Sequence, residues 1–271
     1  MIKLINILSI DVALGALAMT LVWSYHFAVP FDWLHGTGLF LVVWLIYTID
    51  HLMDVRSAIT IVGQRYWFHQ RYRKTLIVCS SIVCITLLSF LFWVNLTILF
   101  VATIIFIAAA LHLWCNSLAN KKQFFYPKEW VIGLVYTLGV SVSSVVYMID
   151  HFGIEELSVL CLILTTAFLN IFLLSFFDVA ADIAQGTNSI AIRLGTKKLE
   201  KRIFFLFILG LSLCFITLFY LAPTIVFAFL LIQISYLFIY YKRSFFARHE
   251  RYRLFIDLAY SFPFLLLFID K

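Results

Sequence analysis

The sequence predicts an all-α membrane protein with nine transmembrane helices, arranged as two four-helix units and one more helix around a central cavity open to the cytoplasmic side. The first observation behind this prediction is composition. Hydrophobic residues make up 64% of the 271 residues and charged residues only 13%, whereas soluble domains carry roughly 25% charged residues. The second observation is the recurrence of apolar runs near the length that crosses a bilayer, which form helices because hydrocarbon cannot hydrogen-bond an open backbone. The third is the alternation of basic and nearly uncharged loops along the chain.

The nine predicted helices correspond to nine apolar runs. In chain order they are Ile7–Phe27, Trp33–Leu52, Thr75–Phe92, Leu96–Trp114, Trp130–Met148, Leu157–Phe177, Arg202–Leu221, Thr224–Tyr241 and Leu254–Ile269. Short links join the third helix to the fourth and the seventh to the eighth, while the loops after the second and sixth helices are long and basic. This shared spacing favours two parallel repeats around an axis along the membrane normal.

We therefore expect a single integral-membrane domain over residues 1–271. Its first half covers residues 1–128 and its second half residues 129–241, with the ninth helix in residues 242–271. Apart from the spacing, the two halves show no obvious sequence identity.

The distribution of basic residues tests the nine-helix count independently. When the loops are assigned alternately to the two sides of the membrane, 19 of the 20 Lys and Arg residues fall on one side, and the exception is Lys271. Because basic loops stay in the cytoplasm, the amino terminus is predicted to be cytoplasmic and the carboxyl terminus to be outside. The net charge of +6 is then a topology signal, and we expect membrane lipids but no nucleic acid as partners.

Two pairs of carboxylates stand where the second and sixth apolar runs end. They are Asp50 with Asp54 and Asp178 with Asp182. On a helix, residues four apart share one face with Cβ atoms about 5–6 Å apart, so each pair repels itself unless a cation lies nearby. Oxygen ligands at this density suit Mg²⁺, which binds one or two carboxylates and completes its shell with water and substrate phosphate. All four aspartates are predicted Mg²⁺ ligands and catalytic residues on the cytoplasmic side.

Other polar residues share the helix faces of these pairs. Tyr47 precedes Asp50 by one turn, while Ser175 and Asn170 precede the second pair. Single Ser and Asn residues in membrane helices more often hydrogen-bond another helix, which is the role we expect for Ser175 and Asn170. For Tyr47, a place in the substrate site and a structural hydrogen bond are equally good accounts. His51 lies on a different helix face from the aspartates and is not expected to be a ligand.

The second motif carries a family resemblance. The stretch Asp178-Val-Ala-Ala-Asp182-Ile-Ala-Gln-Gly186-Thr-Asn-Ser189-Ile-Ala-Ile-Arg193-Leu-Gly195 resembles the second signature of the UbiA superfamily of intramembrane prenyltransferases. Asp50 and Asp54 match the last two carboxylates of the first signature of that family. The resemblance extends to the nine-helix count and covers most of the chain.

The chain also departs from the family pattern. Ile46 stands where the family usually has Asn, Ile183 replaces a basic residue, and Asn188 replaces a Lys. These losses remove one metal ligand and two phosphate-binding groups of typical members. Arg65, His69 and Lys122, in the basic loops, are candidates to compensate by binding the diphosphate together with Tyr47, although contact with lipid headgroups explains Arg65 and Lys122 equally well.

The resemblance implies a Mg²⁺-dependent prenyltransferase, which moves a prenyl group from a prenyl diphosphate to an aromatic or isoprenoid lipid acceptor within the membrane. A catalytically weak or inactive lipid-binding relative is the first alternative, because the departures affect the site itself. A cation or metabolite transporter is the second, since transporters also use repeats and intramembrane carboxylates.

Two further carboxylates lie within predicted helices. A charge at mid-bilayer costs about 2.5–3.5 kcal/mol on insertion scales, so each is expected to have a partner or a wet cavity. Asp257 has Arg253 one turn away as a partner, and Asp11 is expected either to help bind the acceptor or to make a buried hydrogen bond.

Overall fold

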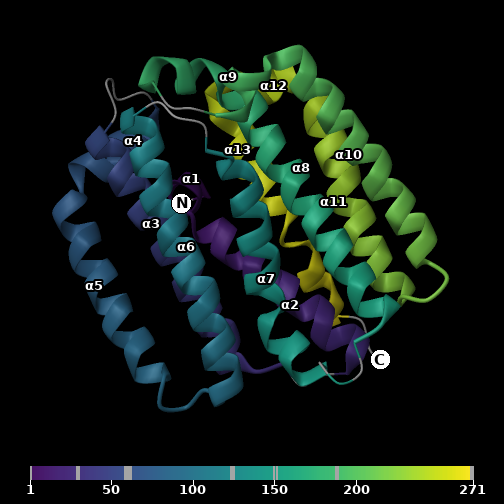
Figure 1. The fold of residues 1–271 in the computed structure, drawn as a ribbon. Coiled ribbons are helices and arrows are strands. Elements are labelled where there is room, and N and C mark those ends of the chain that lie inside the picture. The colour runs from purple at the N-terminus through teal and green to yellow at the C-terminus, as the bar shows by residue number, and fades with distance from the viewer. Residues whose placement is uncertain are drawn as a thin grey trace.

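The computed structural model describes residues 2–28, 31–57, 63–122, 126–148, 150, 152–186 and 189–268. The described residues form helices and connecting turns without strands, as the sequence predicts. Within the described ranges, seven helices are long and apolar enough to cross a membrane. They pack side by side as an elongated bundle (Figure 1).

Eight helices make up the bundle. They are α2 (Ile10–Phe27), α3 (Trp33–Ser57), α5 (Arg73–Phe90), α6 (Leu96–Lys122), α7 (Lys128–Met148), α8 (Ile154–Gln185), α10 (Thr196–Thr217) and α11 (Pro223–Tyr241). Shorter helices connect or extend them. These are α1 (Ile2–Ile7), α4 (Gln64–Arg71), α9 (Ile190–Leu194), α12 (Arg243–Ala247), η2 (Arg248–Glu250), α13 (Arg251–Ala259) and η3 (Phe262–Phe268).

The predicted seventh and ninth spans are not among the seven candidate spans, so the count of nine remains a prediction. Helix α10 has 22 residues, but charged side chains occupy its first two turns. The prediction of one continuous ninth helix over Leu254–Ile269 is wrong, because α13 ends at Ala259 and a 3₁₀ helix follows. Pro263 accounts for the break, since it lacks a backbone N–H and disfavours α-helical geometry in the residue before it.

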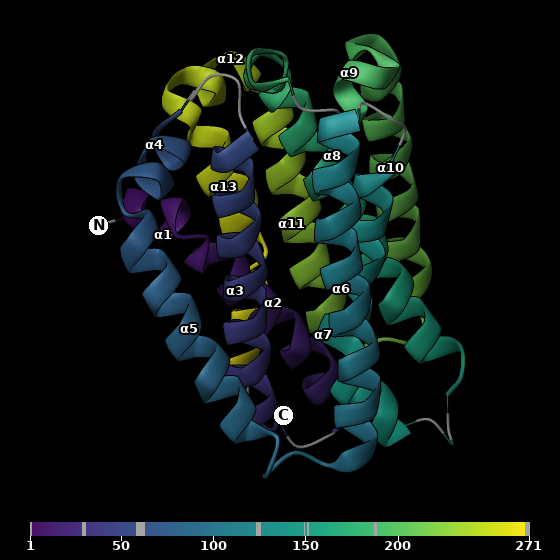
Figure 2. The same cartoon turned by 60° about the vertical axis from the view of Figure 1, so that its left-hand side comes forward.

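Helix α8 is the central element and α5 is peripheral. In the most apolar window of α8, 67% of the residues are buried within the protein, against 6% for α5. Helix α8 packs against α7, α10, α11 and α13, whereas α5 packs mainly against α3 and stands at the edge of the bundle (Figures 1 and 2). The exposed apolar side chains of α5 are those expected of a helix that faces lipid.

A close contact between α2 and the end of α13 fixes the carboxyl-terminal segment. A Cβ added to Gly15 would lie 2.6 Å from Tyr260 Cβ, a distance that no side chain tolerates. Glycine at this position therefore lets the end of α13, the helix that carries Tyr252 and Arg253, lie against α2.

The short helices α4, α9 and α12 lie at the same end of the bundle (Figure 2). Their connecting segments contain most of the basic loops, so the structure gathers these loops on one side. This agrees with the predicted charge segregation, while the orientation relative to the membrane and the division into two repeats stay predictions.

Candidate functional site

The two aspartate pairs occupy the last turns of α3 and α8, and both helix ends lie at the end of the bundle that carries α4 and α9 (Figure 2). Asp54 lies close enough to Asp182 for their charges to interact. The hydroxyl of Tyr66 on α4 is within electrostatic range of Asp54, Asp50 and Asp178, which belong to both pairs. The structure thus brings the residues of both predicted motifs to one place.

The first pair is contacted by neutral side chains from two other helices. The Tyr66 hydroxyl donates to Asp54 Oδ2 over 3.5 Å. The amide of Asn116, a buried residue of α6, lies near the Asp50 carboxylate. Burial, together with the nearby Asp54 carboxylate, raises the pKa of the Tyr66 hydroxyl, which keeps it protonated as a donor.

The second pair is contacted by a cation from α13. Arg253 Nη2 donates to Asp178 Oδ1 over 2.5 Å, and the Tyr252 hydroxyl donates to the same oxygen. Burial lowers the pKa of the Arg253 guanidinium, but the Asp178 carboxylate and the other acidic groups around it together outweigh burial and raise the pKa overall. The predicted pairing of Arg253 with Asp257 is therefore wrong. The two residues are one turn apart on α13, but the Arg253 guanidinium forms its ion pair with Asp178 on α8.

Lys128 lies within electrostatic range of three of the aspartates. It begins α7, and its ammonium interacts electrostatically with Asp182, Asp54 and Asp50. Nothing in the sequence separates Lys128 from the other loop cations, because its position beside the carboxylates depends on how α7 packs between α3 and α8. The sequence also gave no reason to single out Asn116, Tyr66 or Tyr252.

The compensating residues expected from the basic loops have different surroundings. Arg65 donates to the backbone oxygen and the side-chain oxygen of Asn6 over 2.8 and 3.2 Å. His69 Nδ1 lies 2.9 Å from the Arg65 backbone oxygen, and both side chains are buried. These contacts hold α4 against α1. Lys122 is the last residue of α6, and its side chain lies outside the described residues.

His51 is nearer to the aspartates than the sequence indicates. One nitrogen of His51 and one oxygen each of Asp50 and Asp54 lie within 4.8 Å of one another. The Nε2 atom of His51 lies 3.3 Å from Ser9 Oγ and 3.4 Å from Arg65 Nη1. The ring is therefore turned toward α1 and α4, and it links the first motif to Arg65.

The tail of the second motif, from Gly186 to Gly195, has a structural role. Arg193 forms an ion pair with Glu129 over 3.0 Å, and Glu129 also accepts a 2.6 Å hydrogen bond from the Ile190 backbone N–H. Because Glu129 follows Lys128, this pairing fixes the segment after α8 to the start of α7. Gly186 and Gly195 have φ angles of 71° and 74°, which glycine adopts without strain.

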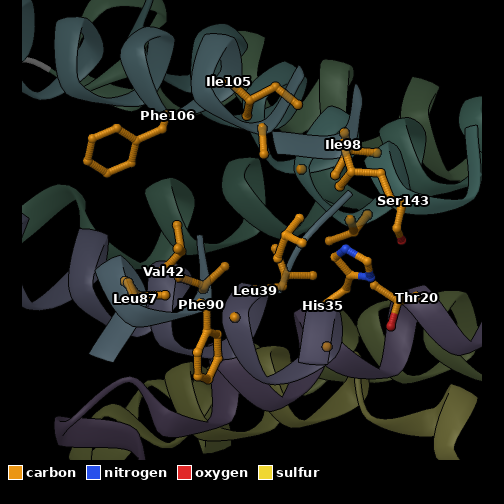
Figure 3. Close-up of a pocket in the computed structure, with 18 of the residues that line it drawn as sticks. Thr20, His35, Leu39, Val42, Leu87, Phe90, Ile98, Ile105, Phe106 and Ser143 are labelled. Atoms are coloured by element: carbon orange, nitrogen blue, oxygen red, sulfur yellow. The ribbon is translucent and has the colours of Figure 1, made fainter. Parts of the chain in front are cut away.

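A large apolar cavity lies about one helical turn from the aspartates. Its volume is about 520 Å³, and its walls come mainly from α3, α5, α6 and α7. Figure 3 shows apolar side chains along most of the wall, with His35, Thr20 and Ser143 grouped near one end. The lining residues of α3 run from Leu34 to Tyr47, which spans about 20 Å at 1.5 Å per residue.

Three helices lead from the charged group into this cavity. Tyr47, His112 and Ile132 line the cavity, and each lies three or four residues from a polar residue of the site. Those polar residues are Asp50, Asn116 and Lys128. Side chains at this spacing share a helix face one turn apart, so the charged group caps one end of a long apolar space.

The donor atoms of the site fit Mg²⁺. Four carboxylates converge from two helices, with the Asn116 amide beside Asp50, and hard oxygen donors are what Mg²⁺ selects. Arg253 and Lys128 add positive charge at the margin. The arrangement matches a site that binds a metal ion together with a polyanion.

Comparison of the sequence with protein-family models and with curated proteins gives no match. The structure resembles the apo structure of a UbiA homolog from Aeropyrum pernix K1, with a TM-score of 0.65. The alignment covers 96% of this chain and 98% of that chain at 12% sequence identity. The resemblance expected from the aspartate motifs is thereby confirmed at the level of fold: this chain has the fold of a UbiA homolog.

Proposed function

We propose that the protein is an intramembrane prenyltransferase, which transfers a prenyl group from a prenyl diphosphate to a lipophilic acceptor. The observation that supports this proposal is the position of a charged site one helical turn from a long apolar cavity. An amphipathic donor with a diphosphate head and a hydrocarbon tail matches both parts. The fold shared with a UbiA homolog supports the same class of function.

The head group would lie among the aspartates. Asp50, Asp54, Asp178 and Asp182 would hold Mg²⁺, which neutralises the charge that develops on a diphosphate leaving group. Lys128, which already lies near three of these carboxylates, would contact the diphosphate oxygens as a point charge. Arg253 would hold Asp178 in place.

Asn116 would compensate for the Asn that is missing at position 46. Ile46 lines the apolar cavity, so it offers no ligand atom to the site. The Asn116 amide reaches Asp50 from α6 and would supply an oxygen ligand, or fix the Asp50 carboxylate, from the opposite wall. Arg65, His69, Lys122 and Tyr47 remain candidate diphosphate ligands, of which Tyr47 lies where the charged site meets the cavity.

The apolar cavity would hold the prenyl chain and keep water from the allylic carbon. Aromatic side chains, including those of Tyr47 and Tyr136, line the cavity near the charged end. The faces of such rings stabilise a positive charge, so they would favour departure of the diphosphate from the allylic carbon. The acceptor then attacks that carbon.

Turnover by the purified protein in lipid nanodiscs tests the proposal. With Mg²⁺, a panel of prenyl diphosphates and lipophilic acceptors, the wild type should release pyrophosphate in the presence of a suitable acceptor. Asp54→Ala and Asp178→Ala should each abolish this release, whereas Asp150→Ala should not, because Asp150 follows the far end of α7. Absence of prenyl diphosphate binding with Mg²⁺ would overturn the proposal, and ion flux into liposomes would then favour a transporter.

A catalytically inactive lipid-binding protein is the second candidate. One observation favours it: Arg253 already pairs with Asp178 over 2.5 Å, where a metal ligand needs a free oxygen. A protein of this kind would retain a copurified lipid in the cavity, bind prenyl diphosphate without turnover, and show no dependence on Mg²⁺. The same nanodisc experiment therefore separates the two functions.

A further inference from the structure

Polar side chains gather at the end of the large cavity that is remote from the aspartates. Figure 3 shows His35, Thr20 and Ser143 grouped at this end, and all three line the cavity. They come from α3, α2 and α7 respectively. The proposed function places a hydrocarbon chain in this cavity, and it gives no role to a polar group at the far end.

The distance between the charged site and this polar group follows from helix geometry. His35 precedes Asp50 by fifteen residues on α3, and Ser143 follows Lys128 by fifteen residues on α7. Each separation corresponds to about 22 Å along the helix. The residues of α3 that line the cavity between His35 and Tyr47 have no polar side chains, so an apolar stretch separates the two polar ends.

The start of α3 holds the His35 ring at this end of the cavity. His35 Nδ1 lies 2.6 Å from Asp32 Oδ2, and Asp32 Oδ1 accepts from the Leu34 backbone N–H over 2.8 Å. A Cβ added to Gly36 would lie 2.8 Å from a methyl carbon of Leu17, so α3 packs closely on α2 beside the ring. The start of α3 is thus fixed, and the His35 side chain is fixed with it.

His35 is a polar group that hydrocarbon cannot satisfy. Its side chain is only 13% exposed, and its Nε2 atom is buried without a hydrogen-bond partner among the residues that the structure describes. A buried polar group without a partner is costly. Hydrocarbon packed against Nε2 would exclude any other partner and impose that cost in full. The position of His35 therefore disfavours a chain that extends to it and leaves a shorter chain unaffected.

The apolar stretch has the length of a particular donor chain. Tyr47, at the charged end of the cavity, and His35 are separated by twelve residues of α3, which is about 18 Å along the helix. We propose that His35 limits the donor to about four isoprene units, the extended length that fits this distance. The inference rests on the proposed prenyltransferase function and specifies its donor. It uses a general means of discrimination, in which the wrong ligand would desolvate a polar group.

Binding of prenyl diphosphates of different lengths tests the inference. The probes are farnesyl, geranylgeranyl and hexaprenyl diphosphate, which are respectively shorter than, equal to and longer than the proposed limit. Affinities are measured with Mg²⁺ in lipid nanodiscs. Because longer chains also partition into lipid, each probe is compared between protein variants and not with the other probes. His35→Leu should bind hexaprenyl diphosphate about 10-fold more tightly than the wild type, because no polar group is then desolvated, and should bind farnesyl diphosphate as the wild type does.

Two further variants separate the polarity of the group from the shape of the cavity. His35→Gln keeps a polar side chain at this position, so it should bind hexaprenyl diphosphate as weakly as the wild type. Leu39 lines the cavity one turn nearer the aspartates, so Leu39→Trp should weaken geranylgeranyl diphosphate binding about 10-fold by overpacking and leave farnesyl diphosphate binding unchanged. Thr37→Leu is the control, because Thr37 is exposed on the same helix and is not a lining residue.

The outcomes separate this inference from the proposed function. If hexaprenyl diphosphate binds His35→Leu no more tightly than the wild type, or gains equally in His35→Gln, the chain-length inference is overturned and the donor site stands. Unchanged binding of geranylgeranyl diphosphate to Leu39→Trp would overturn it as well, because the chain would not extend to that level. If the wild type binds none of the three diphosphates with Mg²⁺, the proposed function itself fails. Farnesyl diphosphate binding by each variant serves as the check on folding.

Discussion

Asp50 and Asp178 have the same place in their motifs and the same place at a helix end, yet their surroundings differ. Asp50 has the neutral Asn116 amide near its carboxylate. Asp178 accepts from the guanidinium of Arg253 and from the Tyr252 hydroxyl. The charge of Asp178 is thus balanced by the protein itself, whereas Asp50 depends on a more distant Lys128 or on a bound cation.

This difference indicates that the two motifs have different roles. A carboxylate paired with a buried guanidinium anchors the helix that carries the guanidinium, and here it holds α13 against α8. A carboxylate oriented by a neutral amide keeps its charge for a ligand. We infer that the first motif responds more strongly to Mg²⁺ and that the second contributes more to stability.

The largest effect is expected from Asp50→Asn. The substitution keeps the size of the side chain and its place near Asn116, but removes the charge offered to Mg²⁺. Turnover should fall about 10²–10³-fold, the range seen when one preorganised electrostatic group is removed. Turnover measured across a Mg²⁺ titration checks this, with the melting temperature as a control for folding, and an unchanged Mg²⁺ dependence would contradict the proposed role of the first motif.

The next effect is on stability and comes from Arg253→Gln. Breaking a buried ion pair costs about 3–5 kcal/mol because one charge is left without compensation, and both side chains here are only 15% exposed. Thermal unfolding without Mg²⁺ should show this loss, and added Mg²⁺ should restore part of it by binding Asp178. Arg243→Gln is the matched control, since Arg243 is 53% exposed where it pairs with Glu200, and exposed pairs contribute at most about 1 kcal/mol. Equal loss in both variants would show that Asp178 does not depend on Arg253.

A smaller effect is expected from Asn116→Leu, which leaves the Asp50 carboxylate without its orienting amide. Mg²⁺ affinity should fall about 10–100-fold, as is typical when a group that orients a metal ligand is lost. Trp114→Leu is the control on the same helix, because Trp114 is 60% exposed on the outer surface. If the two variants bind Mg²⁺ equally well, the amide of Asn116 does not replace the Asn missing at position 46.

The sequence predicts the aspartates of both motifs because their spacing is local. Residues four apart on one helix share a face in any fold, so Asp178 and Asp182 can be paired without knowing what surrounds them. The same reasoning predicts the helical runs and the all-α class. It also predicts the interhelical hydrogen bond of Asn170, which the contact with Tyr236 on α11 confirms.

The partners of the aspartates are set by packing between helices, and local spacing does not contain that information. Arg253 is adjacent to Asp257 along α13, but it pairs with Asp178 because α13 lies against α8. Arg65 and Lys128 are both loop cations in the sequence, yet one contacts α1 and the other lies near the carboxylates. The break in the predicted ninth helix, in contrast, can be predicted from local sequence, because Pro263 lies within the apolar run.

The smallest effect tests how firmly the second motif depends on α13, through Gly15→Ala. The new Cβ would meet Tyr260 Cβ at 2.6 Å, and overpacking of this kind costs about 1–3 kcal/mol. The higher helix propensity of alanine offsets up to about 1 kcal/mol of this cost. We therefore expect the free energy of unfolding, measured by thermal unfolding, to fall by a net value near 1 kcal/mol. Gly139→Ala is the control, because a Cβ there meets nothing within 4 Å and only the propensity gain applies.

Since α13 carries the partners of Asp178 and not that of Asp50, displacement of α13 in Gly15→Ala should reduce the stabilisation lost on Arg253→Gln while leaving the Mg²⁺ response of Asp50→Asn unchanged. A Gly15→Ala protein in which Arg253→Gln costs as much as in the wild type would mean that the Arg253–Asp178 pair forms independently of this contact.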